Sequence, residues 1–410
     1  MSLIDTALVN TARVRSAMVI GGGISGPVTA AALQRAGIAT RVYEAYPGPA
    51  HSIGSNLALA PNGVAALDVI GVGDAIRAIA APFSAQSAAI GAKHVDLPRL
   101  AGVEPLRLVD RPDLHRVLHE HAVAQGVEIE YGRRLIGVDE RADGVTARFA
   151  DGSTATADVL IGADGIHSAT RSLIDPQAPG PTYLRMLGFG SYTTCDLELP
   201  PESMTFAFGH RAYYLYGSMP DGRVMWGANL PHDRKLSLTE ARAIPAERWL
   251  EILRETYAQD NPGAELARRT RPEDLEVVGG LYIMPRVPNW SRGRMVLTGD
   301  AVHAPSNSSG QGASLAIESG IELARCLRDI GDPAAAFAAY EALRRPRVEA
   351  VAARVARTNS TKAAGPIARR MMSAVMPVMF RMMNPEKVFG AEQRFRIDWD
   401  APVRPARVSA

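Results

Sequence analysis

The chain has 410 residues, of which 47% are hydrophobic and 21% are charged. This length allows two domains and more than one buried core, and the composition is that of an ordinary globular protein in water. A formal net charge of +2 argues against a nucleic-acid-binding protein, which would carry a large basic excess.

Cysteine content and the N-terminal composition bear on location. The two cysteines, Cys195 and Cys326, form no disulfide framework and no metal cluster, which fits a reducing compartment. Residues 1–15 lack the uninterrupted apolar core of a signal peptide, and no apolar stretch is long enough to span a bilayer without charges. We expect a cytoplasmic monomer or homodimer without a transmembrane segment, a nucleic-acid partner or a bound metal.

The first predicted elements surround a glycine-rich turn. A buried strand over Arg15–Ile20 leads at once into Gly21-Gly22-Gly23-Ile24-Ser25-Gly26, a helical pattern runs on to Gly37, and a second strand covers Ile38–Glu44. This is the context in which G-x-G-x-x-G binds a dinucleotide. Gly21 allows the tight turn, Gly23 leaves room for a pyrophosphate, and Gly26 lets the helix pack closely on the strand.

Further residues of this turn are predicted partners of the dinucleotide. The amide end of the helix, at Ile24 and Ser25, favours phosphate charge. Glu44 ends the second strand, beside Ala45, where a carboxylate accepts hydrogen bonds from ribose hydroxyls. These features predict dinucleotide binding without distinguishing FAD from NAD.

Three histidines, His115, His119 and His121, follow on a predicted helix. Their spacing would suit a metal only with further cysteine or carboxylate ligands, and no such cluster accompanies them. We therefore expect the surface of a helix here.

A second motif follows the apolar strand that begins at Leu160. It reads Ala163-Asp164-Gly165, with Arg171 on the segment that follows. Asp164 can accept a hydrogen bond from a hydroxyl or an ordered water, and Gly165 lets the backbone come close to a ligand. Alone, the motif is equally typical of a turn before a short helix.

The region from Tyr183 to Tyr282 has a different pattern. Short strands at Thr205–Phe208, Ala212–Tyr216 and Arg223–Ala228 predict an antiparallel sheet. Because alternate strand residues face opposite sides, each bulky residue here either lines an apolar pocket or packs in the core. The candidates for the pocket are His210, Tyr213, Tyr216, Met225 and Trp226.

A third motif begins with the strand Arg294–Leu297 and continues into Thr298-Gly299-Asp300. Asp300 stands at the carboxyl end of a strand, where open α/β sheets bind ligands. The later loop, with Gly310 and Gly312 before Ala313, opens a helix whose free amides suit an anion such as the pyrimidine edge of reduced flavin. His303 is interpreted as local structure rather than as a base.

The C-terminal part is basic and rich in methionine. From Ala342 onward it holds 14 Lys/Arg and 5 Asp/Glu, which we interpret first as a solvated helical surface, with an acidic partner, a membrane surface or an anionic ligand as alternatives. The methionine stripe predicts core packing or a lid, or a flexible apolar wall for a bulky substrate, or, least favoured, membrane contact. The methionines are Met371, Met372, Met376, Met379, Met382 and Met383.

The order and spacing of the three motifs resemble the class A flavoprotein monooxygenases, the family of para-hydroxybenzoate hydroxylase, salicylate hydroxylase and the tetracycline-modifying monooxygenases. The resemblance covers Arg15 to Arg347. It implies that Glu44 holds the adenosine ribose, that Arg111 reaches the ribityl and phosphate region, and that Asp164 handles both flavin and NAD(P)H. It also implies that Asp300 bonds the ribityl chain, that Gly310 and Gly312 bring amides to the flavin ring, and that residues 54–62 lie along the isoalloxazine.

Two positions depart from that family. Asn307 stands where many members carry proline, beside the flavin face where oxygen reacts, and Ser319 stands where many carry aspartate. We expect the Ser319 change to be a small local matter. Pro305 and Asn307 join the candidates for the substrate pocket.

The implied fold is α/β, with a Rossmann-type FAD-binding domain (15–75, 101–181 and 283–345) interleaved with an antiparallel-sheet substrate domain (76–100 and 182–282) and followed by a C-terminal helical segment (346–410). The implied reaction uses NAD(P)H and O2 to hydroxylate or epoxidise an aromatic or a polyketide- or terpenoid-like small molecule, as in secondary metabolism. Oxygen transfer would proceed through a flavin C4a-hydroperoxide, so no side chain is predicted to be catalytic. A flavin-dependent reductase or dehydrogenase of related fold, which Asn307 keeps open, and a non-catalytic FAD-binding module are the alternatives.

Overall fold

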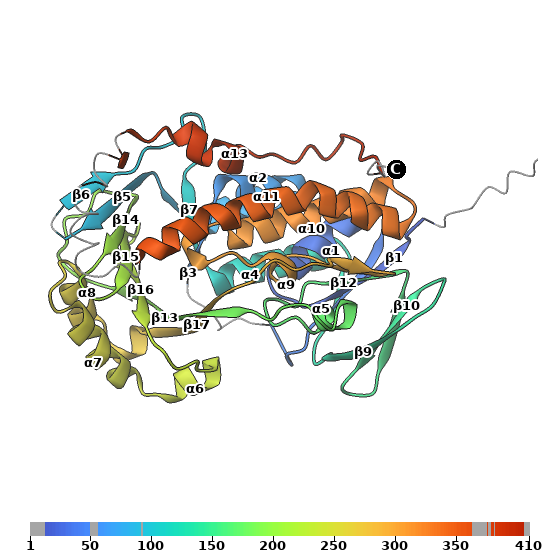
Figure 1. Ribbon diagram of the computed structural model, residues 1–410, viewed down its shortest axis with the longest axis horizontal. Helices are drawn as coiled ribbons and strands as arrows, with labels where there is room; N and C mark the ends of the chain where they lie inside the picture. Colours follow the sequence, from blue (N-terminus) through green and yellow to red (C-terminus); the bar gives the residue numbers. More distant parts are fainter. Residues whose placement is uncertain are drawn as a thin grey trace, which may run out of the picture.

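The computed structural model describes residues 13–49, 56–91, 93–362, 375, 379–380 and 382–405. Figure 1 shows two bodies side by side, a mixed α/β body and a β-rich body, with the long helices α10 and α11 running along them. The α/β class and the interleaving of two domain types are confirmed, because the chain enters the β-rich sheet twice and returns each time.

The α/β body is built on a six-stranded sheet of order β18-β19-β12-β1-β2-β8. β1 pairs in parallel with β2 and β12, and β12 pairs in parallel with β19. Their carboxyl ends therefore meet at one edge, and each of the three glycine motifs follows one of them. The strands are β1 (Ser16–Ile20), β2 (Ala39–Tyr43), β8 (Glu128–Glu130), β12 (Val159–Gly162), β18 (Ser291–Arg292) and β19 (Met295–Leu297).

Helices cover this sheet, and its central strands are apolar because both of their faces are buried. Gly320 of α10 lies directly against Thr29 of α1, so the two helices approach closely. The helices are α1 (Ser25–Arg35), α2 (Pro61–Val69), α3 (Gly73–Ile79), α4 (Arg111–Ala124), α5 (Ala169–Ile174), α9 (Asp300–His303) and α10 (Gly312–Asp329).

The β-rich body is a seven-stranded sheet of order β17-β13-β16-β15-β14-β5-β6. Helices α6 (Leu238–Ala243), α7 (Ala246–Tyr257) and α8 (Gly263–Arg269) accompany it. Trp226, Trp249 and Tyr257 are buried in the core that the sheet shares with these helices. The strands are β5 (Ala85–Ile90), β6 (Lys93–Asp96), β13 (Thr182–Thr193), β14 (Ser203–Phe208), β15 (Tyr213–Ser218), β16 (Val224–Pro231) and β17 (Glu276–Ile283).

Two three-stranded sheets complete the fold. One contains β9 (Leu135–Glu140), β10 (Val145–Phe149) and β11 (Thr154–Ala157), and the other β3 (Asn56–Leu59), β4 (Ala81–Phe83) and β7 (Leu106–Asp110). Phe83 and Leu108 of the second sheet pack against Met204 and Met225 of the seven-stranded sheet. This contact joins the two bodies beside the site described below.

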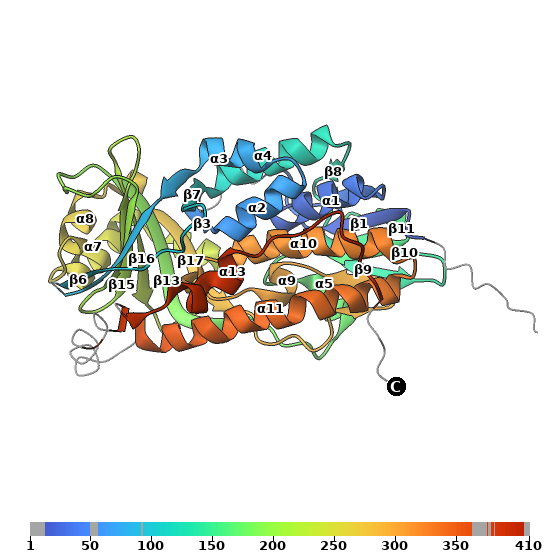
Figure 2. The same cartoon turned by 90° about the horizontal axis from the view of Figure 1, so that it is seen from above.

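The C-terminal segment returns along the molecule. Helix α11 (Pro333–Lys362) is followed by the short helical segments η3 (Glu386–Gly390) and α13 (Ala391–Gln393), which Figure 2 shows lying across the junction of the two bodies. Arg347 of α11 donates to the backbone carbonyls of Ala391 and Glu392 at 2.8 and 2.9 Å, which fixes the returning segment. Within the described part of the chain, no helix is long and apolar enough to cross a membrane.

Candidate active site

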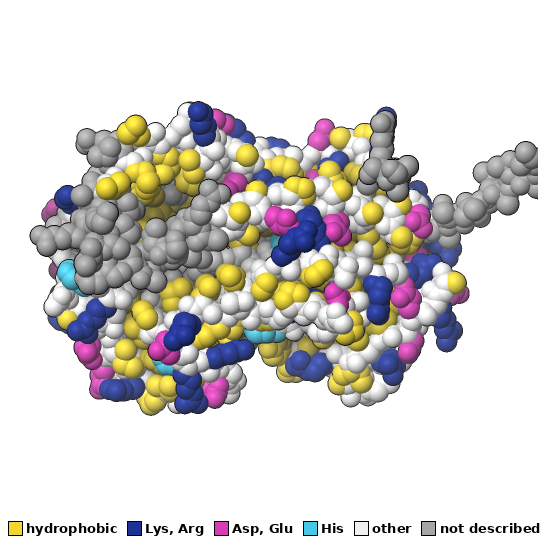
Figure 3. Space-filling view, in the orientation of Figure 1, with side chains coloured by type: hydrophobic (Ala, Val, Ile, Leu, Met, Phe, Trp, Pro, Cys, Tyr) yellow, Lys and Arg dark blue, Asp and Glu magenta, His cyan; other side chains and the backbone are white. Residues whose placement is uncertain are grey.

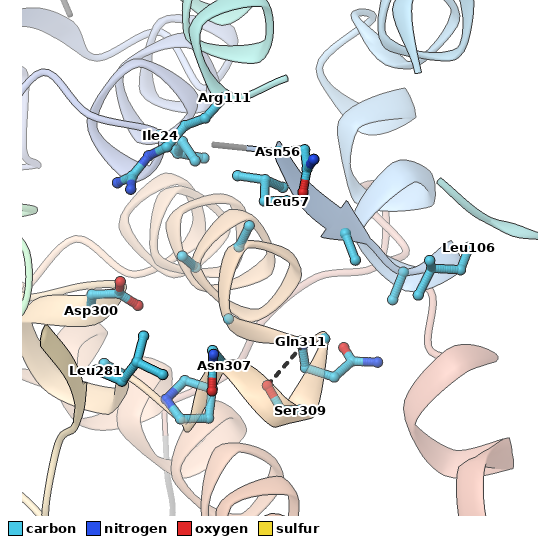
Figure 4. Close-up of a pocket in the computed structure, with 18 of the residues that line it drawn as sticks. Ile24, Asn56, Leu57, Leu106, Arg111, Leu281, Asp300, Asn307, Ser309 and Gln311 are labelled. Carbon is cyan, nitrogen blue, oxygen red and sulfur yellow. Dashed lines mark hydrogen bonds between the residues drawn. The ribbon is translucent and has the colours of Figure 1, made fainter. Parts of the chain in front are cut away.

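A large cavity lies where the two bodies meet. Its volume is about 1690 Å³, above the ~300–1,000 Å³ of most small-molecule pockets. Figure 4 shows Arg111, Asp300, Asn307 and Gln311, which come from separate elements, around one open space. The cavity has room for an extended dinucleotide together with a second molecule.

The predicted cofactor residues are brought together here. All of them except Gly26 line the cavity: Gly21, Gly23, Ile24, Ser25, Glu44, Ala45, Arg111, Asp164, Asp300, Gly310, Gly312 and Ala313. Of residues 54–62, positions 54 and 55 lie outside the described residues, whereas Asn56, Leu57, Ala58 and Ala60 also line it.

The glycines of the first turn have different structural roles. Gly21 has a φ of +105°, and a Cβ there would lie 2.5 Å from the carbonyl oxygen of Ala163. A Cβ on Gly26 would lie 1.9 Å from the carbonyl oxygen of Gly21, so Gly26 holds α1 against β1. A Cβ on Gly23 would meet no protein atom within 4 Å. Gly23 therefore keeps space open in the cavity rather than allowing protein packing.

The start of α1 is suited to a phosphate. No side chain caps it, and its first turn has no acidic residue, so its first amides remain available to a ligand. The Ser25 hydroxyl is buried without a hydrogen-bond partner, although a buried hydroxyl ordinarily has one. An uncapped helix end, an orphan hydroxyl and an open glycine together fit a pyrophosphate.

Glu44 follows β2 and is held by the backbone. Its carboxylate accepts hydrogen bonds from the amides of Gly22 at 2.6 Å and Tyr46 at 2.9 Å. The amide of Arg133 donates to the Glu44 carbonyl, which brings the neighbouring Arg134 to the cavity wall. The sequence analysis missed Arg134 because no motif marks its loop.

Asp164 and Arg171 connect the second and third motifs. The Asp164 carboxylate accepts hydrogen bonds from the Ser168 hydroxyl and from the amide and hydroxyl of Thr170, at 2.5–3.0 Å, and so fixes the start of α5. Arg171 is buried and donates to the carbonyls of Ile166 and Ala301 at 3.0 and 2.9 Å. The turn after β12 is thereby tied to the turn after β19.

Asp300 opens α9 directly after Gly299, whose φ is +61°. Asp300 lines the cavity and is accessible from it. Desolvation by the surrounding protein raises the pKa of the carboxyl, and the positive charge of Arg111 partly opposes that rise. Asp300 therefore offers hydroxyl groups a strong acceptor inside the cavity.

Replacing Asp300 with asparagine is expected to weaken FAD binding roughly 10- to 100-fold, because hydrogen bonds to charged groups contribute about 1.5–3 kcal/mol. Titration of the apoprotein with FAD, followed by flavin fluorescence, measures this. The melting temperature of the apoprotein should not fall, because the raised folded-state pKa means that the ionised carboxyl opposes folding at neutral pH. Any gain in the melting temperature of the variant over the wild type should vanish as the pH falls below about 4, because the wild-type carboxyl is then protonated in both the folded and the unfolded state. Unchanged FAD affinity would remove Asp300 from the cofactor site.

The N-terminus of α10 forms another part of the cavity wall and follows the third motif in the chain. No side chain caps the helix at Gln311, and its first turn has no acidic residue. Gly310 has a φ of +59°, and the Gln311 amide donates to the Ser309 hydroxyl at 2.9 Å (Figure 4). Pro305 and Asn307, the two substrate-pocket candidates of this loop, also line the cavity. The N-terminus of α10 can therefore stabilise a negative charge in this part of the cavity.

A buried ionic network supports this wall and was missed by the sequence analysis. Glu318 of α10 is fully buried, and its carboxylate contacts Arg344 at 2.7 Å and Arg347 at 2.8 Å. It also accepts from the amide of Asn62 at 2.7 Å, and Asn62 in turn donates to Gln311 at 3.0 Å. Burial alone would raise the pKa of Glu318, but the two guanidiniums and Asn62 together lower it.

The same network corrects one expectation. Arg344 is fully buried, so the basic C-terminal excess is not simply a solvated surface. Ser319 also belongs to this network. Its hydroxyl lies 2.8 Å from the Nε2 of buried His303 and accepts from Arg344 at 3.2 Å. Burial lowers the pKa of His303 to about 3, so His303 stays neutral, in agreement with a structural role.

The seven-stranded sheet contradicts four of the substrate-pocket candidates. Tyr213 lines the cavity, but Tyr216, Met225 and Trp226 are buried in the hydrophobic clusters instead, and the Trp226 indole donates to Thr270 at 2.9 Å. His210 is exposed at the strand end and pairs with Asp260 at 3.0 Å. Their neighbours Leu215, Gly227 and Asn229 line the cavity in their place.

The structure also corrects the expected location of the histidines on α4. His115 is buried, and its Nε2 lies 2.7 Å from the carbonyl oxygen of Gly22. His115 therefore supports the first glycine turn and does not lie on the exposed helix surface that the sequence pattern predicts. His119 contacts the hydroxyl of Tyr131. The described residues contain no group of three or more possible metal ligands.

The C-terminal segment closes the cavity opposite the sheet. Met379, Phe380, Met383 and Phe389 line it, which supports the interpretation of the methionine stripe as an apolar wall. Met382 instead faces outward, while Met371, Met372 and Met376 lie outside the described residues. In Figure 3 apolar side chains gather over this end of the molecule, and charges of both signs are interspersed over the rest of the face.

Known proteins resemble this chain over most of its length. The family model described as the FAD binding domain matches residues 15–355. A 3-amino-4-hydroxybenzoate 2-monooxygenase from Streptomyces platensis is 33% identical, with 84% of this chain and 87% of the relative covered. An FAD-dependent urate hydroxylase from Klebsiella pneumoniae is 30% identical, with 81% and 86% covered. The crystal structure of Klebsiella pneumoniae HpxO complexed with FAD and uric acid aligns with a TM-score of 0.78 at 25% identity, covering 92% of this chain and 96% of that one.

Proposed function

This chain belongs to the FAD-binding-domain family, and from that premise we propose that its cavity holds FAD and an aromatic substrate side by side. The protein is an FAD-dependent monooxygenase of the aromatic hydroxylase type, and NAD(P)H is its co-substrate. The observation that carries the proposal is the continuity of the cavity, which runs from the first glycine turn to the seven-stranded sheet.

We propose that FAD lies along the carboxyl edge of the six-stranded sheet. Its pyrophosphate would meet Gly23, Ser25 and the amides of α1, and its adenosine ribose would meet Glu44. Its ribityl chain would lie between Asp300 and Arg111. The amides at the start of α10 would face the flavin ring. The uncapped helix ends and the orphan Ser25 hydroxyl support this placement.

Bound FAD supplies the chemistry that takes electrons from NAD(P)H and transfers an oxygen atom from O2. The protein therefore has to bind and orient the substrate and exclude water. Phe206, Leu215 and Phe389 enclose the substrate end. The amides of α10 can stabilise negative charge that develops on the ring they face. No side chain needs to act as a nucleophile.

The domain division is also proposed. Residues 15–75, 101–181 and 283–345 would form the FAD-binding domain and residues 76–100 and 182–282 the substrate domain, with 346–410 as a C-terminal helical segment. The membership of β5, β6 and β13–β17 in one sheet supports this division. The free cysteines Cys195 and Cys326 support a cytoplasmic location. The oligomeric state stays a prediction of monomer or homodimer.

The decisive test of this function is whether the electrons of NAD(P)H are used to hydroxylate a substrate or are released as hydrogen peroxide. FAD-loaded protein is mixed with NADH or NADPH and a panel of aromatic compounds, and NAD(P)H consumption, hydrogen peroxide and product are measured together. A monooxygenase should consume NAD(P)H faster with substrate and form matching amounts of hydroxylated product. Product without added oxygen would indicate a reductase. Slow NAD(P)H consumption with every compound would indicate a non-catalytic FAD-binding module.

A further inference from the structure

The strand register defines the surface that the seven-stranded sheet presents to the substrate. One row across the sheet places Ala88, Phe206, Leu215 and Gly227 opposite one another, and the next row places Phe208, Tyr213, Asn229 and Gly188 opposite one another. All eight line the cavity. These two rows are therefore aliphatic and aromatic apart from the hydroxyl of Tyr213 and the carboxamide of Asn229. Gln86 of β5 and Tyr282 of β17 add uncharged polar groups elsewhere on the sheet's side of the cavity.

Asn229 carries the one carboxamide in these two rows, where it can hydrogen-bond an uncharged polar group of a ligand. It is only 9% exposed, and its carboxamide oxygen has a long contact of 3.5 Å with the amide nitrogen of Asn307. Burying a carboxamide in apolar surroundings is unfavourable unless its donor and acceptor find partners. A substrate carbonyl, phenol or ring N–H would supply such a partner between Asn229 and Asn307.

The arginine side chains at the substrate end of the cavity are poorly placed to bind a substrate carboxylate. Arg354 lines the cavity, but its Nε and Nη2 donate to the carboxylate of Glu392, at 2.5 and 2.7 Å. Arg99 lies on an exposed loop at the rim. Among the described residues of the substrate end, the charged pair Arg354–Glu392 is internally compensated and the remaining interior side chains are neutral polar or apolar. A carboxylate would therefore lose its hydration there without a buried cation other than the one already paired with Glu392.

Resting on the proposed function, we propose that the substrate is an uncharged fused or extended aromatic molecule whose phenol, carbonyl or N–H is read by Asn229 and Asn307. Its apolar body would lie between Phe206, Leu215 and the C-terminal wall at Phe389. This distinguishes the chain from its relative from Streptomyces platensis, whose name specifies an aminohydroxybenzoate. Asn229 is a specificity-determining residue in this account.

A matched pair of ligands tests the proposal on the FAD-loaded enzyme without turnover. 1-Naphthol and 1-hydroxy-2-naphthoate differ by one carboxylate, and each can be titrated by its effect on flavin absorbance. We expect 1-naphthol to bind at least tenfold more tightly. Asn229→Leu should weaken 1-naphthol about tenfold, the effect of one lost hydrogen bond, but should leave binding of naphthalene, which has no hydroxyl, unchanged. Arg99→Gln should change neither affinity.

The contrary results are equally specific. Equal or tighter binding of the naphthoate, dependence of its binding on Arg99, or no saturable binding of either ligand would overturn the proposal. Oxygenation of a carboxylate substrate would overturn the neutral-substrate proposal while leaving the monooxygenase function intact. Tight, Asn229-dependent binding of 1-naphthol without oxygenation of any compound would contradict the proposed function and leave the binding preference standing.

Discussion

Replacing Gly26 with alanine is expected to leave a protein that does not retain FAD and that unfolds at a clearly lower temperature. The added Cβ would lie 1.9 Å from the carbonyl oxygen of Gly21 and 3.7 Å from Val19. Because the atom in conflict is backbone, α1 would have to move away from β1, and the first glycine turn would move with it. Overpacking of this kind destabilises by about 1–3 kcal/mol or more. FAD content after purification and thermal unfolding of the apoprotein measure the two effects.

The matched variant Gly23→Ala separates folding from cofactor binding. A Cβ at Gly23 would meet no protein atom within 4 Å, so the apoprotein should unfold at the wild-type temperature. FAD affinity should nevertheless fall at least about tenfold, because the methyl group would occupy the space assigned to the pyrophosphate. If Gly23→Ala bound FAD normally, the pyrophosphate would have to lie elsewhere.

Replacing Glu318 with glutamine is expected to destabilise the protein by about 3–5 kcal/mol, the usual effect of breaking a buried ion pair. The substitution keeps the shape of the side chain but leaves Arg344 and Arg347 without their shared carboxylate. Because Asn62 and Gln311 belong to the same network, FAD release should also be faster. Chemical denaturation of the apoprotein gives the first value and FAD release kinetics the second.

The pH dependence of this effect has a defined sign. Since the folded-state pKa of Glu318 is lowered, its stabilising contribution is present above the unfolded pKa and is lost as the pH falls through the folded value. The difference between wild type and variant should therefore shrink below about pH 4. Glu251→Gln is the control, because Glu251 pairs with Arg248 in an exposed contact that is worth about 0–1 kcal/mol. Equal effects of the two substitutions would show that the buried network is not a main support of the fold.

The cofactor half of the site was predictable because its requirements are local. The tight turn at Gly21, the close approach at Gly26 and the acidic residue after the second strand are each fixed by a few neighbouring residues and by backbone geometry. Asp300 was identifiable for a similar reason, since it follows closely after a strand whose carboxyl end meets the same sheet edge as the first turn.

The substrate half was less predictable because a sequence pattern does not determine which face of a strand points into the cavity and which points into the core. A shift of one residue exchanges Trp226 for Gly227, and the bulkier residue is the more obvious pocket candidate. The structure reverses that choice, since Trp226 is needed in the core with Tyr257 and Trp249, while Gly227 keeps the cavity open.

The ionic network was invisible in the sequence for another reason. Glu318 and Asn62 are 256 residues apart, and Arg344 is part of a stretch whose composition suggests an exposed basic surface. Their proximity depends on the packing of α10 against α2 and α11, which is a property of the tertiary structure. The buried His115 was misplaced in the same way, because its partner is the backbone of the distant Gly22.

The central claim is that this cavity supports insertion of one oxygen atom from O2 into an aromatic substrate. The most direct measurement is turnover of FAD-loaded protein with NAD(P)H under ¹⁸O2, with mass spectrometry of the product formed from a compound that stimulates NAD(P)H oxidation. The account predicts a hydroxylated product that carries a single ¹⁸O atom. A product whose added oxygen comes from water, or a transformed product without added oxygen, would contradict it.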